Sequence, residues 1–160
     1  MSEIKQKDPA MEVSMVNISE KTRVHREAIA VGSIRLKPDT IQKLTSGQTE
    51  KGDAIQIAKI AGIQAAKLTP LIIPLCHPIQ IEYVDIKTKI LRDSVEITAK
   101  VVSEGKTGVE MEALTAVSVA LLNIWDVVKA YEKDEKGQYP STVIERISVK
   151  SKVKRKIEDS

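Results

Sequence analysis

Four stretches of the chain carry the apolar pattern of β-strands. Residues 28–36 (AIAVGSIRL) form a short apolar run that ends at the polar sequence KPDT. Residues 79–91 (IQIEYVDIKTKIL) and 94–104 (SVEITAKVVSE) alternate apolar and polar positions, and the short RDS between them predicts a hairpin. Residues 142–150 (TVIERISVK), after the break at GQYPS, predict a last strand.

Two stretches have the three- and four-residue spacing of amphipathic helices. Residues 38–47 (PDTIQKLTSG) predict a short helix that Gly47 closes. Residues 54–68 (AIQIAKIAGIQAAKL) predict a longer helix, in which Gly62 permits close packing. We expect this helix to end before residues 69–78 (TPLIIPLCHP), because the three prolines there disfavour a continuing helix.

A third predicted helix, residues 111–131, is apolar over more than one stripe and would hold about five or six turns. One stripe is enough to pack on a sheet, so the excess indicates a subunit interface. With the helices at 38–47 and 54–68 counted as one helical segment, the order is strand, helix, strand, strand, helix, strand. This order predicts an α+β, ferredoxin-like fold, βαββαβ, with an antiparallel sheet and the helices on one face. That fold hosts many functions, so function has to come from individual residues.

Length and charge indicate one soluble domain. The 160 residues fit a single domain, 1–160, with a flexible segment at 1–14 and a basic tail at 150–160. Six cations against two anions between 146 and 160 account for the net charge of +3, so the basic character describes a mobile tail rather than a binding face. The start lacks a signal-peptide pattern and no later run is long enough to cross a bilayer, which predicts a cytoplasmic protein without membrane contact.

The rare residue types exclude several classes of protein. Aromatic residues make up only 2% of the chain, too few for the stacking platforms of single-stranded nucleic-acid binders, so we expect no nucleic-acid partner. The single cysteine excludes an internal disulfide and gives no evidence for an oxidising compartment.

The sequence PLCHP, residues 74–78, gathers Cys76 and His77. One cysteine and two histidines are too few for a structural zinc site and no carboxylate spacing completes one, so we expect no metal. A Cys–His nucleophile pair is disfavoured because adjacent residues in an extended segment point to opposite sides. A distant base that activates Cys76 stays open, as does a buried thiol that acts as a small hydrophobe. For His77, a substrate-facing role and a satisfied polar group at a strand start both stay open.

The sequence EGKTG, residues 104–108, is similar to the end of a phosphate-binding loop, but Lys100 stands where that pattern needs a glycine. Main-chain amides at the start of a long helix suit an anion, and an ordinary turn fits equally well.

Two charged groups stand out: KGD at 51–53, and Asp126 with Lys129 one turn later. Such a pair is more often a surface ion contact, yet a lysine in apolar surroundings can have a lowered pKa and serve in acid–base chemistry. Glu112 and Asp126 are 14 residues apart, which puts them near one helix face but ~21 Å apart along the axis. They cannot share a small-molecule site within one chain, whereas antiparallel twofold packing of two copies would bring them together.

Taken together, these motifs resemble one family, the cyclic pyranopterin monophosphate synthases, which are the C proteins of molybdenum cofactor biosynthesis. The similarity covers roughly residues 15 to 135, and segments of this length are far more specific than one short pattern. The matching segments are MVNISEKTRVHREAIAVGSI (15–34), KGD (51–53), AKIAGIQAAK (58–67), IIPLCHP (72–78), GKTGVEMEALTAVSVALL (105–122) and WDVVKA (125–130).

The resemblance implies a lyase that converts 3′,8-cyclo-7,8-dihydroguanosine 5′-triphosphate into cyclic pyranopterin monophosphate and releases pyrophosphate. It also implies a ferredoxin-like fold and a homo-hexamer, a trimer of dimers with sites at the dimer interfaces. No cofactor is implied, and a divalent ion that accompanies the triphosphate stays open.

Carried over residue by residue, the resemblance implies two sets of site residues. The catalytic set is Asp126, Lys51, Lys129, His77 and Glu110, and the substrate-binding set is Leu75, Cys76, His77, Met111 and Glu112. Cations on phosphate oxygens would come from Lys51, Lys67 and Lys106. The C-terminal sequence VKSKVKRKIEDS lacks the glycines of the tail that bacterial members often carry, which leaves a phosphate contact there unassigned.

Two other function classes stay open. The first is a non-catalytic ferredoxin-like module that binds a nucleotide or a protein partner. The second is nucleic-acid binding through residues 150–160, which would be sensitive to salt and lost with that segment.

Overall fold

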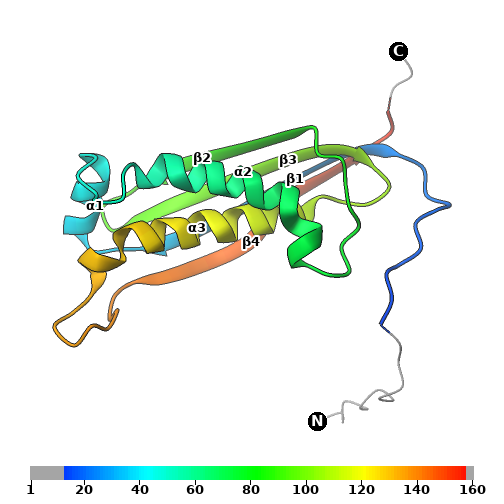
Figure 1. Ribbon diagram of the computed structural model, residues 1–160. Helices are drawn as coiled ribbons and strands as arrows, with labels where there is room; N and C mark the ends of the chain where they lie inside the picture. The colour runs from blue at the N-terminus through cyan, green and yellow to red at the C-terminus, as the bar shows by residue number, and fades with distance from the viewer. Residues whose placement is uncertain (1–12, 158–160) are drawn as a thin grey trace, which may run out of the picture.

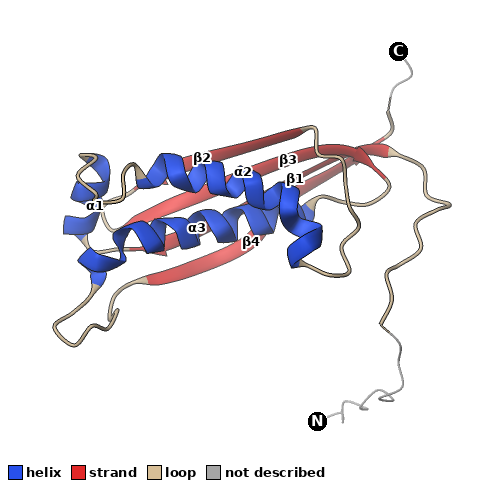
Figure 2. Cartoon of the chain, in the orientation of Figure 1, coloured by secondary structure: helices blue, strands red, loops and turns tan. Residues whose placement is uncertain are grey.

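The computed structural model describes residues 13–157, which form one antiparallel sheet with two long helices on one face (Figures 1 and 2). The strand order in the sheet is β2-β3-β1-β4. The predicted α+β, ferredoxin-like fold is therefore confirmed, and a short helix, α1, lies at one end of the helix layer. The predicted flexibility of residues 1–14 falls almost wholly outside the described residues. The elements in chain order are β1 (Val24–Arg35), α1 (Pro38–Thr45), α2 (Ala54–Ile72), β2 (Tyr83–Ile90), β3 (Ser94–Gly105), α3 (Glu110–Glu132) and β4 (Val143–Arg155).

Glycines allow α3 to lie close to the sheet and to α2. A Cβ at Gly32 of β1 would lie 2.8 Å from Cγ1 of Val117 and 2.9 Å from Cδ1 of Leu121. A Cβ at Gly62 of α2 would lie 3.1 Å from the main-chain oxygen of Ala116. All three distances are shorter than ordinary van der Waals contacts, so the predicted close packing at Gly62 is confirmed.

Helix α2 is longer than its sequence predicts. It continues through Pro70 to Ile72, so the expectation that the prolines end it before residue 69 is wrong. A proline inside a helix removes one main-chain donor and crowds the carbonyl four residues earlier, but the burial of Ala65, Ala66 and Thr69 holds the last turns of α2 in place. The last turn is closed by the amide of Ile73, which donates to the carbonyl of Thr69 at 2.8 Å. The PLCHP corner therefore begins about one turn later than expected.

Strand β4 is also longer than predicted and absorbs most of the basic tail. It pairs with β1 along its length, with Lys152 opposite Ala28 and Lys154 opposite Arg26. Residues 150–155 are thus an edge strand rather than a mobile end. Lysines at alternate positions suit an edge strand, because their charge opposes pairing with other sheets.

A buried carboxylate anchors the C-terminal end of α3. Glu132 is fully buried and accepts a hydrogen bond from the main-chain N–H of Lys37 at 3.0 Å. It also accepts one from the hydroxyl of Thr142 at 2.5 Å. Glu132 thereby joins α3 to the start of α1 and to the residue before β4, which fixes the half of α3 that carries Asp126.

By length and composition alone, α3 is apolar enough to cross a membrane, so the expectation that no segment meets that test is wrong. Of its most apolar 18-residue window, 56% is buried inside the described structure, against α2, β1 and β3. A helix in a protein core passes the same test, and packing on α2, β1 and β3 accounts for the buried part of α3.

Candidate active site

A carboxylate and two lysines meet beside the C-terminal half of α3. Oδ2 of Asp126 lies 2.7 Å from Nζ of Lys51, and Oδ1 lies 2.8 Å from Nζ of Lys129. Nζ of Lys51 also donates to the main-chain oxygen of Asp126 at 3.2 Å. The fold thus brings together three of the predicted catalytic residues, with Lys51 arriving from 75 positions away.

The KGD sequence places Lys51 through the roles of its two neighbours. Gly52 has a φ of +97°, in the left-handed region that favours glycine. Asp53 caps α2, because its Oδ1 accepts from the main-chain N–H groups of Ile55 at 3.0 Å and Gln56 at 3.1 Å. Lys51 is therefore held at the end of a loop whose turn and exit are both specified locally.

In this cluster, the contact between Asp126 and Lys129 stabilises the charged form of both side chains. Hydrogen bonds from Lys129, and then from Lys51, lower the pKa of Asp126 to about 2. The same carboxylate raises the pKa of Lys129. The hypothesis that apolar surroundings lower the pKa of Lys129 is therefore wrong, because its contact with Asp126 outweighs the loss of solvent. At neutral pH the cluster holds one carboxylate and a protonated Lys129.

The predicted substrate-binding residues line one pocket at the opposite end of α3. The pocket has a volume of about 440 Å³ and lies between the PLCHP corner, the first turn of α3 and the chain around residues 16–21. Figure 1 shows the corner after α2 beside the N-terminal end of α3, far along the helix from α1. The predicted residues on its wall are Leu75, Cys76, His77, Glu110, Met111 and Glu112.

The PLCHP corner is a turn rather than an extended segment at Cys76, whose amide donates to the carbonyl of Ile73 at 3.0 Å. Burial, and then the charge of Glu112, raise the pKa of Cys76, which favours the thiol over the nucleophilic thiolate. Nε2 of His77 lies 2.7 Å from the main-chain oxygen of Val16. A carbonyl oxygen only accepts, so Nε2 carries the hydrogen and Nδ1 is the nitrogen left for a ligand.

Glu110 and Glu112 line the same pocket, but their pKa values are shifted in opposite directions. Partial burial of Glu110 opposes its ionisation, yet a hydrogen bond from Nζ of Lys152 at 2.8 Å and the charge of Arg26 lower its pKa. Glu112 is only 2% exposed, and burial, with the charge of Glu110 added, raises its pKa. Within residues 13–157, Oε2 of Glu112 has no hydrogen-bond partner. A buried oxygen of this kind is a ready acceptor for a ligand N–H.

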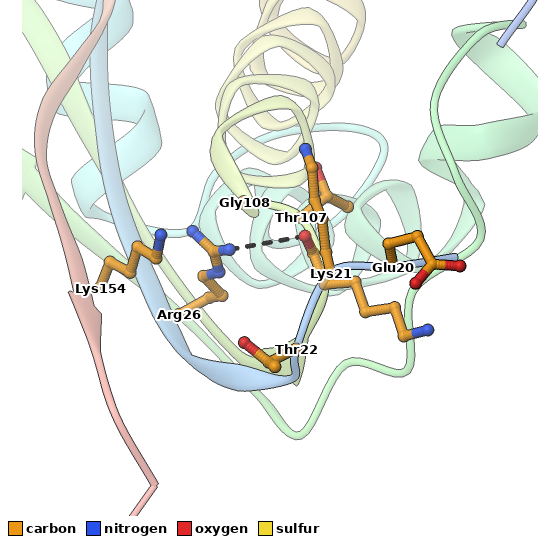
Figure 3. Close-up of a pocket in the computed structure, with 8 residues that line it drawn as sticks. Glu20, Lys21, Thr22, Arg26, Thr107, Gly108 and Lys154 are labelled. Atoms are coloured by element: carbon orange, nitrogen blue, oxygen red, sulfur yellow. Dashed lines mark hydrogen bonds between the residues drawn. The ribbon is translucent and has the colours of Figure 1, made fainter. Parts of the chain in front are cut away.

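A second pocket, of about 470 Å³, adjoins the first and shares Lys21, Thr107 and Gly108 with it. Figure 3 shows Arg26 and Lys154 projecting from neighbouring strands toward the same space, as expected of register partners. Nη2 of Arg26 donates to the main-chain oxygen of Lys106 at 3.5 Å, while its Nε has no partner among the described residues. Four cations line the pocket, which suits phosphate groups: Lys21, Arg26, Lys106 and Lys154.

Lys106 was predicted for phosphate binding, but the other three cations of this basic pocket were missed. The β1–β4 pairing that brings Lys154 beside Arg26 was hidden by the interpretation of residues 150–160 as a tail. The alternation of lysines at 150, 152 and 154 is the signal that indicates a strand there. The other two phosphate candidates line neither pocket: Lys67 is exposed on α2, and Lys51 contacts Asp126.

One chain keeps these groups apart. The Asp126 cluster lies at one end of α3 and the two pockets at the other, and the 14 positions from Glu112 to Asp126 correspond to ~21 Å of helix. No group of three His, Cys, Asp or Glu side chains suited to a metal occurs within residues 13–157. Within one chain, the lysine–carboxylate cluster and the two pockets, one of them lined by four cations, therefore lie at opposite ends of α3.

The chain is an α+β protein with a ferredoxin-like fold, a lysine–carboxylate cluster and a pocket lined by cations. A cation-lined pocket of this kind suits phosphorylated small molecules. The chain belongs to the MoaC family, whose family model matches residues 15–154.

Archaeal relatives match along nearly their whole length. A protein from Thermococcus kodakarensis is 58% identical over 142 residues, 89% of this chain and 91% of the relative. One from Sulfolobus acidocaldarius is 56% identical over 140 residues, 88% of this chain and 98% of the relative. One from Saccharolobus solfataricus is 53% identical over 145 residues, 91% of this chain and 97% of the relative. Each is named a probable cyclic pyranopterin monophosphate synthase, so the family resemblance found in the sequence is confirmed.

Proposed function

We propose that this protein is a cyclic pyranopterin monophosphate synthase of molybdenum cofactor biosynthesis. It acts as a lyase that converts 3′,8-cyclo-7,8-dihydroguanosine 5′-triphosphate into cyclic pyranopterin monophosphate and releases pyrophosphate. The relatives of that name, 53–58% identical over about nine-tenths of the chain, support this function. The observation that carries it is the convergence of Lys51, Asp126 and Lys129, the predicted acid–base group.

The pKa directions suggest how protons are handled. Asp126, with a pKa of about 2, is ionised at neutral pH and suits stabilisation of positive charge, because so low a pKa makes it a weak proton acceptor. Lys129, with a raised pKa, stays protonated and suits contact with a developing anion rather than release of its proton. Glu112, with a raised pKa, keeps a proton more readily than an ordinary glutamate and suits the role of a general acid.

The two pockets suggest where the substrate lies. The basic pocket would hold the triphosphate, because its four cations offset the charge that builds up on phosphate oxygens. The adjoining pocket would hold the purine-derived ring, where Oε2 of Glu112 accepts from a ring N–H and Nδ1 of His77 contacts a polar ring atom. Glu110 would hold Lys152 beside the phosphates through their 2.8 Å contact. The proposal includes no resident cofactor.

A complete site on this proposal needs two copies of the chain, because the acid–base cluster and the pockets are ~21 Å apart along α3. We propose a homo-hexamer, a trimer of dimers with sites at the dimer interfaces, in the cytoplasm and without nucleic-acid or membrane partners. Large apolar side chains that are exposed on α2 and α3 support burial by another copy: Ile60, Leu71, Ile72, Met111 and Leu122.

Incubation of the purified protein with the cyclic guanosine triphosphate substrate tests this function. Pyrophosphate and the cyclic pyranopterin are expected as products, and Asp126→Asn and Lys51→Ala should abolish turnover while the fold and ligand binding persist. A folded wild-type protein that binds the substrate and forms no product would instead identify a non-catalytic binding module.

A further inference from the structure

Tyr131, near the end of α3, contacts the loop that carries Lys51. Its hydroxyl accepts a hydrogen bond from the main-chain N–H of Glu50 at 3.0 Å, across 81 positions of sequence. Its ring lies under the ammonium group of Lys43 in α1, with Nζ 5.3 Å from the ring centroid. Tyr131 is therefore half-buried between α1, α3 and the loop between α1 and α2.

That loop, residues 46–53, is held in shape at both ends by contacts within the loop and with α2, but most of its residues are exposed. It opens with Gly47 at φ +68° and ends with Gly52 at φ +97° and the Asp53 cap. The amide of Gly52 donates to the carbonyl of Thr49 at 3.2 Å, which closes a turn within the loop. These bonds shape the loop without fixing where it lies relative to α3.

Two hydrogen-bonding groups of the loop reach α3. One is the side chain of Lys51, which contacts Asp126, and the other is the amide of Glu50, which contacts Tyr131. A lysine side chain has several rotatable bonds and loses much freedom when it is held in one place, so its ion pair alone orders the loop weakly. The main-chain bond next to it restricts the backbone from which Lys51 extends.

We propose that Tyr131 is a positioning residue, whose hydroxyl holds the backbone at Glu50 so that the ammonium group of Lys51 stays on Asp126. This role rests on the proposed function only as far as Lys51 serves in turnover; its effect on the Lys51–Asp126 contact stands without it. Within residues 13–157, no hydrogen bond joins Tyr131 to Asp126, and Tyr131 lines neither pocket. The charged groups that contact Asp126 are Lys51 and Lys129.

Tyr131→Phe in the full-length protein tests the proposal, because it removes the hydroxyl and keeps the ring that contacts Lys43. The matched control is Tyr83→Phe, which removes the hydroxyl of a half-exposed tyrosine on β2. Three quantities are measured: the hydrogen-exchange rate of the loop amides, the titration midpoint of Asp126 by ¹³C NMR of labelled aspartate, and kcat for pyrophosphate release. Loss of one hydrogen bond predicts amide exchange about three- to tenfold faster in the loop and kcat about three- to tenfold lower.

The titration of Asp126 separates a positioning role from a merely structural one. Because Lys51 is one of the two groups that lower the pKa of Asp126, Tyr131→Phe should raise the midpoint, and Tyr83→Phe should leave it unchanged. In a Lys51→Ala background, Tyr131→Phe should cause no further rise. An unchanged midpoint in Tyr131→Phe, or an equal rise with and without Lys51, would overturn the proposal. If the wild type forms no product, the proposed function fails, while exchange and titration still decide the role of Tyr131.

Discussion

Gly108 and Glu110 compete for one space at the pocket beside the PLCHP corner, which both residues line. A Cβ at position 108 would overlap the carboxylate of Glu110, whose Oε1 accepts a hydrogen bond from Nζ of Lys152 at 2.8 Å. The glycine therefore lets a charged pair from α3 and β4 form beside Arg26 and Lys154 of the basic pocket, a role that the spacing of EGKTG alone does not reveal.

Gly108→Ala should disturb the site and spare the fold. The overlapping atoms lie at the end of a flexible side chain, so Glu110 can move away at little cost in stability, but it then leaves Lys152. An ion pair with a lysine as exposed as Lys152 contributes only about 0–1 kcal/mol to stability, so the melting temperature should change little. The displaced Glu110 and Lys152 should still lower kcat/KM by about tenfold, because catalysis is sensitive to misplaced side chains.

Gly105→Ala is the matched control for this prediction. A Cβ there meets its nearest atom at 3.5 Å, an ordinary contact. Equal losses of kcat/KM in the two variants would contradict the role assigned to Gly108.

Cys76 should react slowly with iodoacetamide at neutral pH. Burial and the charge of Glu112 raise its pKa, so its thiolate forms at a higher pH than the thiolate of an ordinary cysteine does. Labelling rates measured against pH give the midpoint directly. Glu112→Gln removes the second cause and should move the midpoint down, whereas a midpoint below that of a free thiol in the wild type would show an activated cysteine.

The ionisation of Asp126 should depend on both lysines. Its pKa of about 2 lies below the usual 3.8, so the ion pairs are fully formed above that usual value and are lost as the pH falls through the lowered one. Lys129→Ala and Lys51→Ala should each raise the midpoint seen by ¹³C NMR, with the larger rise for Lys129, the larger cause. A midpoint that neither variant moves would mean that the contacts do not persist in solution.

Glu132→Ala should destabilise the protein although Glu132 lies outside both pockets. It leaves the main-chain N–H of Lys37 and the hydroxyl of Thr142 without their acceptor, which predicts a loss of about 1–3 kcal/mol or more in the free energy of unfolding. Urea denaturation of Glu132→Ala and of Glu135→Ala, an exposed glutamate nearby, measures the difference. The control should change stability by less than about 0.5 kcal/mol.

The hydrophobic pattern predicts most of the fold because the two-residue alternation of strands and the three- to four-residue spacing of helices differ clearly along this chain. The alternation in residues 94–104 and the helical spacing in 111–131 agree with β3 and α3 to within a residue at most ends. Pro70 was misleading because the local cost of a proline inside a helix is offset here by tertiary packing of the neighbouring Ala65, Ala66 and Thr69, which are buried. The lysines of residues 150–155 were misleading because an edge strand and a solvated tail share the same charged composition.

The candidate site could be predicted only in part, for a related reason. Asp126 and Lys129 are neighbours on one helix, so their contact follows from spacing. The contact of Lys51 with Asp126 and the register of Arg26 with Lys154 depend on tertiary packing, which no local pattern encodes. The pKa of Lys129 was predicted in the wrong direction because the apolar sequence around it does not show that its ammonium group lies on a carboxylate.

The most direct test of the proposed site is complementation between two inactive variants, since the account places Asp126 of one copy with Glu112 of another. Asp126→Asn and Glu112→Gln chains, carrying different tags, are coexpressed and the mixed oligomers are purified through both tags. Each variant alone should release little pyrophosphate. In hexamers that carry both tags and assemble at random, about half of the dimer pairs are mixed, and each mixed pair has one intact site of two. These hexamers should therefore recover about a quarter of the wild-type rate. Mixed oligomers that are no more active than the separate variants would contradict a site shared between copies.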